Sequence, residues 1–510
     1  MDLSEKRGSA RYLVLFFLLM SLAFLLRYLI AFQDISYLDR LFILDDSYYI
    51  LSISRSIAEG LGPSANRIHL TSGFQPLSCL MLVPFFLLGF SADKVLICAI
   101  YLSAFWGSLS TLVIAFLLKN LSGIKAALIG SLLWIFCPII LKNDLNGMET
   151  SLAGFLNLSV LLVVVLVDKK SSFFSLILLG FLCGLALLAR VDSCFLLLAI
   201  GIFALVRWGF SKTIFFVLIA FLVVLPWWIY SLKTFSSIVP ESGPAVKNLL
   251  NYTYKSREYL SLSSFYALIE WFPPLKLTGH SAFLGMVLSI YLILKGSKCT
   301  GVYGYLIGIP FIWVLAFYTW YLPAFWYFTR YYYFIYALII ICISLTISLE
   351  KRKKFNYLYL SFIAIILAVY FIELVSFFAK PERTPDGVLG SLKGYREVVL
   401  EIHKKLKPGD VVGSFQSGAL AYYAPPSVRV INLDGVVNSL AAKALKARGM
   451  KSYVDSEGMN RFADWEADAN FFQSVYGGNF PRGCFNTIYR AKKQGSQNFV
   501  LRNYNPNCES

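Results

Sequence analysis

The chain has 510 residues, of which 58% are hydrophobic and only 15% are charged, and its formal net charge at pH 7 is +17. A mean hydropathy of +0.66 excludes an ordinary water-soluble globule and predicts an α-helical polytopic membrane protein. The positive charge does not indicate a nucleic-acid partner, because Lys and Arg of membrane proteins gather in cytoplasmic loops and near anionic headgroups.

Long apolar runs follow one another along most of the chain. The first run, 12–32, is too long for the apolar core of a signal peptide and has no small-residue cleavage site, so we expect an uncleaved membrane-spanning helix. Runs of roughly 15 to 25 residues approach the length that crosses a bilayer. They predict about eleven spans, at 12–32, 94–118, 123–141, 150–167, 172–189, 194–208, 213–231, 281–295, 301–320, 330–349 and 356–376.

A further apolar stretch, 76–90, is short and is interrupted by Pro84, so we expect a juxtamembrane or re-entrant helix. Every basic loop then falls on one side of the membrane, and the positive-inside rule makes that side the cytoplasm. The basic loops hold Lys119 and Lys125, Lys169 and Lys170, Arg207 and Lys212, Lys295 and Lys298, and the run 350–354. The outer side receives the loop 33–93, the segments 142–149 and 190–193, the loop 232–280, the turn 321–329 and the tail. We expect a multi-pass protein of the inner or plasma membrane.

The tail differs in character from the rest, which predicts two domains, 1–378 in the membrane and 379–510 outside it. Short apolar runs at 410–415 and 428–433 predict buried strands, and 389–406, 417–423 and 436–448 predict helices. The tail is therefore expected to be a small extracytoplasmic α/β domain. Its two cysteines, Cys484 and Cys508, can pair in an oxidising compartment or remain free thiols, and the sequence leaves both states open.

Two adjacent carboxylates, Asp45 and Asp46, follow the first span at the membrane edge, where charged side chains are costly. A single Asp would suffice to cap the amphipathic helix that follows, and this structural interpretation stays open. The second carboxylate favours a chemical role.

Other polar residues lie at the predicted outer ends of the spans. Each has a simple structural interpretation: an acid in a first helical turn, a local ion pair, or an aromatic belt with a basic residue at headgroup depth. Their shared side of the membrane is the stronger indication, and it predicts one substrate-binding site. The candidates are Glu149, Arg190, Asp192, Lys255, Arg257, Tyr327 and Arg330.

Acids and bases at one membrane face suit the transfer of a sugar from a lipid phosphate. A carboxylate can take the proton of an acceptor hydroxyl. Arg, Lys or a cation can stabilise the departing phosphate. A divalent cation such as Mg²⁺, Mn²⁺ or Ca²⁺ could be held by Asp45, Asp46 and Glu149.

Four stretches carry a resemblance to a known family. The first is Asp45-Asp46-Ser47-Tyr48-Tyr49, continued by 58–60 and 71–77; the others are 147–150, 189–192 with 240–243, and 430–438. The chain resembles the GT-C superfamily of membrane glycosyltransferases, in a bacterial and archaeal branch with DDxYY, GMET and NLDGVVN motifs. Where the commoner pattern of that branch has His and Asn, this chain has Gln75 and Ser72, so no catalytic His is expected there.

The resemblance implies a polyprenyl-phosphate sugar as donor and a glycan, lipid or protein as acceptor, on the outer membrane face. It implies that Asp45, with Asp46 beside it, is the catalytic base, and that Glu149 lines the site and can help to bind a metal, with Asp144 a weaker candidate. For the donor phosphate it leaves four candidates, Arg190, Arg330, Lys255 and Arg257.

Two other functions remain open from the sequence. A transporter or flippase of lipid-linked glycans would place polar residues near mid-membrane, whereas here the spans are almost uncharged and Arg27 is the exception. A non-enzymatic envelope assembly protein would account for the tail but not for the paired acids. Convergence of Asp45, Glu149 and a basic residue on one outer-facing cavity would favour the enzyme.

Overall fold

The structure is a computed structural model that describes residues 3–253, 291, 294–296, 301–322, 328–350, 353–380, 382, 394–475, 483–491 and 498–508. The predicted span 281–295, most of the linker to the tail, and the candidate residues Lys255, Arg257 and Tyr327 lie largely or wholly outside these residues.

The first part of the chain is helical. Its elements are α1 (Leu3–Ala31), α2 (Ile35–Leu41), α3 (Asp45–Ala58), α4 (Pro76–Leu87), α5 (Ala92–Ser122), α6 (Ile124–Phe136), α7 (Pro138–Asn143), α8 (Thr150–Lys169), α9 (Phe173–Ala189), the 3-10 turn η1 (Val191–Ser193), α10 (Cys194–Trp208), α11 (Phe210–Phe235), α12 (Ser242–Thr253), η2 (Gly301–Tyr303), α15 (Gly304–Ala316), the π-helical turn η3 (Phe317–Tyr321), α16 (Phe328–Tyr331), α17 (Tyr333–Leu349) and α18 (Lys353–Ala379).

Seven helical segments among the described residues are long and apolar enough to cross a membrane, and four shorter apolar helices accompany them. The polytopic helical fold class is therefore confirmed. One of the shorter helices is α4, which continues through Pro84 where the sequence suggested an interruption. Its 12 residues span only about 18 Å, well below the roughly 30 Å of a bilayer core.

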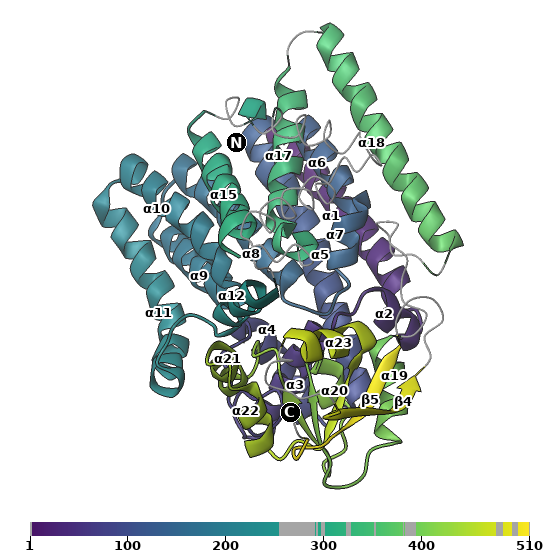
Figure 1. Cartoon of the computed structure of the whole chain (residues 1–510). Coiled ribbons are helices and arrows are strands. Elements are labelled where there is room, and N and C mark those ends of the chain that lie inside the picture. Colours follow the sequence, from purple (N-terminus) through teal and green to yellow (C-terminus); the bar gives the residue numbers. More distant parts are fainter. Residues whose placement is uncertain are drawn as a thin grey trace.

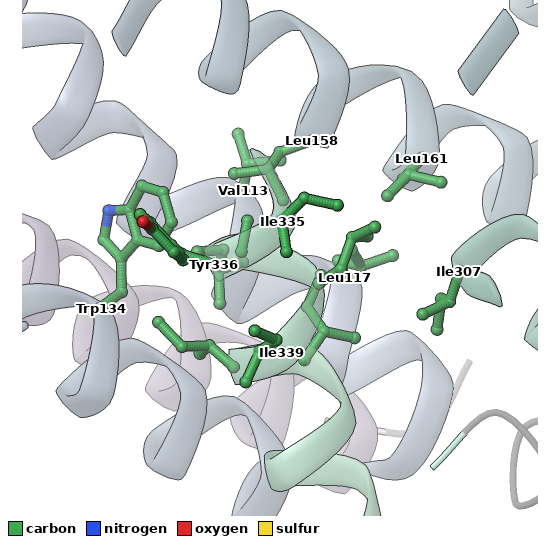
Figure 2. Packing of buried hydrophobic residues seen from close by; sticks show 14 of the residues in the cluster. Val113, Leu117, Trp134, Leu158, Leu161, Ile307, Ile335, Tyr336 and Ile339 are labelled. Carbon is green, nitrogen blue, oxygen red and sulfur yellow. The ribbon is translucent and has the colours of Figure 1, made fainter. Parts of the chain in front are cut away.

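The membrane domain packs around α17. This helix is apolar on every side, which is typical of a helix surrounded by others, and all its residues from 335 to 347 are buried. Figure 2 shows Ile335, Tyr336 and Ile339 of α17 among side chains from α5, α6 and α8, including Leu117, Trp134 and Leu158. These contacts make α17 the centre of the helical domain.

Helices α9 and α11 approach closely through two glycines spaced four residues apart. A Cβ atom on Gly180 would lie 2.4 Å from the carbonyl oxygen of Phe216, and one on Gly184 would lie 2.9 Å from that of Ala220. Small residues with this spacing allow helix backbones to meet inside membranes, so the pair explains the tight α9–α11 contact.

The tail is an α/β domain with one five-stranded sheet of order β2-β1-β3-β5-β4. Its elements are α19 (Tyr395–His403), β1 (Val411–Ser414), α20 (Gly418–Tyr422), β2 (Arg429–Asn432), α21 (Ser439–Lys446), α22 (Met450–Ser456), β3 (Arg461–Trp465), α23 (Glu466–Val475), β4 (Phe485–Ala491) and β5 (Phe499–Tyr504). Strand β1 pairs in parallel with β2 and β3, and β5 pairs antiparallel with β3 and β4. The C-terminal α/β fold is as expected, although β3, β4 and β5 were not predicted. Cys484 and Cys508 form a disulfide.

Figure 1 shows the tail, coloured green to yellow, at one end of the helical bundle, with α3, α4 and α12 at the junction. Helix α20 packs on α3, α19 on α2, and α21 on α12. The segment 33–93 and the tail therefore meet, and Asp45 lies at this junction.

Candidate active site

A cavity of about 520 Å³ lies where the helical domain meets the tail. Its charged lining residues come from five separate parts of the chain: Asp46, Glu149, Arg190, Asp192, Lys247 and Arg330. Apolar and aromatic residues form much of the remaining wall, among them Ile50, Phe74, Phe195, Val239, Phe317, Leu322 and, from the tail, Val436. Five of the predicted site residues are thus brought together.

The two adjacent carboxylates in the first turn of α3 point in different directions. Helix α3 begins at Asp45, after an extended Leu44. Asp46 faces the cavity, and its Oδ2 accepts a hydrogen bond of 2.8 Å from Nη1 of Arg330. Asp45 does not line the cavity; its oxygens accept from the backbone N–H groups of Gly418 and Ala419, at 2.7 and 2.9 Å. The geometry therefore favours Asp46 over Asp45 for contact with a substrate.

Arg190 is the centre of a second ionic group. It donates to Oε1 of Glu149 at 2.8 Å and to Asp192 through Nε and Nη2 at 3.0 and 2.8 Å. Tyr318 also donates to Asp192, at 2.6 Å. Arg190 thus makes the local pair with Asp192 that the sequence left open, and it also bridges to Glu149 at the start of α8. Two carboxylates already neutralise the positive charge of this one guanidinium, so it attracts a further anion only weakly.

Tyr331 connects the two ionic groups. The guanidinium carbons of Arg330 and Arg190 lie 5.2 and 5.6 Å from its ring centroid. The ring stacks on Tyr318 with centroids 4.3 Å apart. Cation–π contacts of this kind orient guanidinium groups, so both arginines are held at defined positions in the cavity wall.

Lys247 of α12 is a cavity residue that sequence reasoning missed. Its Nζ lies 3.9 Å from the ring centroid of Tyr321, and within the described part of the chain it forms no ion pair with a carboxylate. Lys247 follows the 240–243 stretch by only four residues, and that position was the one available signal. It is the lining cation best able to accept a new anionic partner.

Three of the sequence stretches that carried the family resemblance meet beside the cavity. Thr71 donates to the carboxylate of Glu241, and the Glu241 N–H donates to Oγ of Ser72 at 3.2 Å. A Cβ atom on Gly73 would lie 1.8 Å from the carbonyl oxygen of Val436, so only glycine permits this contact between the segment before α4 and the tail.

Two carboxyl groups at the junction have raised pKa values. Burial raises the pKa of Asp45 to about 7, against the opposing effect of the two backbone N–H donors. Burial likewise raises the pKa of Asp434 to about 7, and the negative charges of Asp46 and Asp45 add to this increase. Carboxyl groups with perturbed pKa values beside a cavity are typical of functional sites. The net charge at the junction also depends on whether Asp45 and Asp434 are protonated.

The weaker candidate Asp144 and the nearby His69 do not line the cavity. Asp144 is fully buried; it pairs with Arg27 at 2.7 Å and accepts a hydrogen bond from Tyr333. This pair explains the single charged residue within the first span. His69 lies beside Glu457, with 3.3 Å between Nε2 and Oε2, and does not line the cavity.

The three carboxylates that were expected to hold a divalent cation, those of Asp45, Asp46 and Glu149, do not form a metal-binding arrangement in the structure. Asp45 is occupied by two N–H donors, while Asp46 and Glu149 each pair with an arginine. No group of three His, Cys, Asp or Glu side chains in the described part of the chain is arranged to hold a metal ion. The cationic side chains that line the cavity are Arg190, Lys247 and Arg330.

No family model matches the sequence, and no curated protein sequence is similar to it. Solved structures are similar in fold. ArnT from Cupriavidus metallidurans bound to undecaprenyl phosphate has a TM-score of 0.57 at 13% identity, over 96% of this chain and 98% of ArnT. ArnT in the apo state gives 0.55 at 13% identity, over 97% and 98%. The archaeal oligosaccharyltransferase AglB from Archaeoglobus fulgidus, in complex with an inhibitory peptide and a dolichol-phosphate, gives 0.52 at 12% identity, over 96% and 74%.

These similarities extend over 96% of this chain. At such low identity they establish the fold alone. The expected architecture, a helical membrane domain with a C-terminal α/β domain, is confirmed, and the chain shares its fold with ArnT and AglB.

Proposed function

We propose that the protein is a membrane glycosyltransferase that moves a sugar from a polyprenyl-phosphate donor to a lipid, glycan or protein acceptor. The observation that carries this proposal is the cavity wall in which Asp46 pairs with Arg330 beside the Glu149–Arg190–Asp192 group. A carboxylate next to guanidinium groups supplies both a proton acceptor and positive charge for a phosphate.

The reaction assigned to this site is a displacement at the anomeric carbon of the donor sugar. Asp46 accepts the proton of an acceptor hydroxyl as the oxygen of that hydroxyl bonds to the anomeric carbon. The bond from that carbon to the phosphate oxygen breaks, and its electron pair leaves with polyprenyl phosphate. Asp45 remains an alternative for the base, although both of its oxygens already accept N–H groups.

Arg330 and Lys247 are our assignments for the donor phosphate. Arg330 lies beside the proposed base, where it can neutralise charge that develops on the leaving oxygen. Lys247 has no carboxylate partner among the described residues and lies in the same wall region as Tyr321. Arg190 is a weaker choice, because Glu149 and Asp192 already share it.

The apolar part of the wall suits a lipid chain. Phe74, Phe195, Phe317 and Leu322 are among the residues that line it, and an isoprenoid chain gains from burial of apolar surface. The structures of ArnT and AglB with similar folds were solved with undecaprenyl phosphate and a dolichol-phosphate, respectively, which supports this class of donor.

We place the cavity and the tail on the outer side of an inner or plasma membrane, following the distribution of basic loops. Five of the six charged lining residues lie at or near helix ends, Lys247 lies within α12, and the Arg27–Asp144 pair is fully buried. This arrangement supports an enzyme site at the membrane face over a path through the bilayer.

The test is incubation of the purified protein with a panel of radiolabelled polyprenyl-phosphate sugars and candidate acceptors, with released polyprenyl phosphate as the readout. Release that depends on both protein and acceptor is the expected result. Saturable binding of lipid-linked glycans without release, across the whole panel, would favour a transporter or binding protein and overturn the proposal.

A further inference from the structure

Side chains of α3 form hydrogen bonds to both ends of α20, across the boundary between the membrane domain and the tail. Asp45, in the first turn of α3, accepts the N–H groups of Gly418 and Ala419 at the start of α20. Arg55, in the last turn of α3, donates to the carbonyl oxygen of Tyr422 at 2.8 Å, at the other end of α20. An acid at a helix start and a base at its end complement the helix dipole.

Tyr49, one turn after Asp45, links α3 to the centre of the tail. Its hydroxyl donates to the carbonyl oxygen of Phe415 at 3.0 Å and accepts from Nδ2 of Asn432 at 3.0 Å. The backbone N–H of Ser417 lies 3.3 Å from the same oxygen. The hydroxyl is buried and fully engaged, so this contact specifies one orientation of the tail.

The fit around Asp45 leaves no spare room. A Cβ atom on Gly418 would lie 2.2 Å from the carbonyl oxygen of Asp45 and 2.9 Å from its Oδ2. Further polar contacts extend the interface: Arg396 pairs with Asp93 at 2.7 Å, and Tyr423 donates to the same carboxylate at 2.9 Å. These contacts hold the tail against both α3 and the start of α5.

The same turn of α3 carries the cavity residue Asp46. Ser47, next in sequence, donates to the carbonyl oxygen of Asn146 at 2.8 Å, and Asn146 lies three residues before Glu149. The tail also contributes Val436 directly to the cavity wall. A shift of the tail would therefore move the backbone on which Asp46 and its neighbours are placed.

We propose that the tail is a built-in part of the active cavity, and that Asp45 is a positioning residue that couples docking of α20 to the placement of Asp46. This inference rests on the proposed function for its catalytic consequence, but not for the coupling itself. A displacement of about 1 Å at a reacting group can cost on the order of 100-fold in rate.

The experiment uses the full chain and a glycine outside the cavity. Gly418→Ala forces α20 away from Asp45 without changing the identity of any lining residue. Gly449→Ala in the same domain is the matched control, because a Cβ atom there meets nothing within 4 Å. Ser417→Ala, which removes a 3.2 Å hydroxyl contact to Tyr49, is the milder second variant if Gly418→Ala does not fold.

Two readouts separate coupling from catalysis. Hydrogen exchange followed by mass spectrometry reports the amides of 415–422 in the tail and of 45–49 in α3. Steady-state kinetics report kcat and the apparent donor KM. We expect faster exchange in both segments for Gly418→Ala, and a loss of kcat of about tenfold or more that exceeds the change in KM. Gly449→Ala should match the wild type in both.

The coupling is refuted if exchange rises in 415–422 while 45–49 stays protected, or if kcat is unchanged although both segments exchange faster. If the wild-type protein transfers no sugar from any donor, the proposed function fails, and the exchange data alone still decide whether the tail and α3 are coupled.

Discussion

Neutralising Arg330 should weaken the response to the donor far more than the response to the acceptor. Nη1 of Arg330 lies 2.8 Å from Oδ2 of Asp46, and its side chain is only 8% exposed. A charge-assisted hydrogen bond in such surroundings contributes about 1.5–3 kcal/mol, and each 1.4 kcal/mol corresponds to about tenfold. For Arg330→Gln we therefore expect the apparent donor affinity to fall about 10- to 100-fold.

The assay is a pair of titrations, one with donor at saturating acceptor and one with the roles reversed. Arg207→Gln is the matched control, since Arg207 forms an exposed pair with Asp168 at the end of α10 and should leave both titrations unchanged. Lys247→Gln tests the second assigned cation and should also weaken the donor response. An unchanged donor response in both Arg330→Gln and Lys247→Gln would refute this phosphate site, and the search would move to Lys255 and Arg257.

Three further outcomes are expected. In a background that lacks every cysteine except the disulfide pair Cys484 and Cys508, Ser171→Cys should react only from the cytoplasm and Ser452→Cys only from outside; the reverse pattern would show the inverse topology. The Cys484–Cys508 disulfide links residues 24 positions apart, so replacing both cysteines by Ser should destabilise the tail by about 3 kcal/mol. Chemical denaturation measures this loss, and equal stability of the variant and the wild type would contradict the expectation. Burial lowers the pKa of His403 from its ordinary 6.5 to about 4, so stability present above pH 6.5 should be lost as pH falls toward 4, by up to about 3 kcal/mol. The variant His403→Gln should lack that part of the pH dependence, and identical pH profiles would refute the assignment.

The helical architecture was largely readable from the sequence because apolar runs in a membrane protein have few alternatives to helix. The run 94–118 corresponds to α5 (Ala92–Ser122), and 150–167 to α8 (Thr150–Lys169). In the tail, the buried parallel strands β1 and β2 were predicted from their short apolar runs. Strand β4 was not, because most of its side chains are exposed or only partly buried and its sequence has no strong apolar pattern.

The sequence predicted which residues form the site better than it predicted the orientation and contacts of each side chain. The sequence predicted that five residues lie on the same side of the membrane and form one site: Asp46, Glu149, Arg190, Asp192 and Arg330. All of them line the cavity. Which of two adjacent carboxylates faces a substrate depends on the rotation of α3, and that rotation is fixed by contacts with residues more than 370 positions away. Such contacts leave no local pattern in the sequence.

Lys247 illustrates the same limit for a basic residue. Its sequence neighbourhood gives no charge pattern, and its place in the wall comes from the packing of α12 beside η3 and the tail. The disulfide was open for a similar reason, because pairing depends on how β4 and the C-terminus meet in space.

The central claim is that Asp46 takes the acceptor proton while a polyprenyl-phosphate sugar is cleaved in this cavity. The most direct measurement is a single-turnover assay of labelled polyprenyl phosphate release by the wild type and by Asp46→Asn, with donor binding measured on the same preparations. We expect Asp46→Asn to bind donor and to release product about 10² to 10⁴ times more slowly, the usual cost of losing a general base. Wild-type release rates in Asp46→Asn would contradict the account.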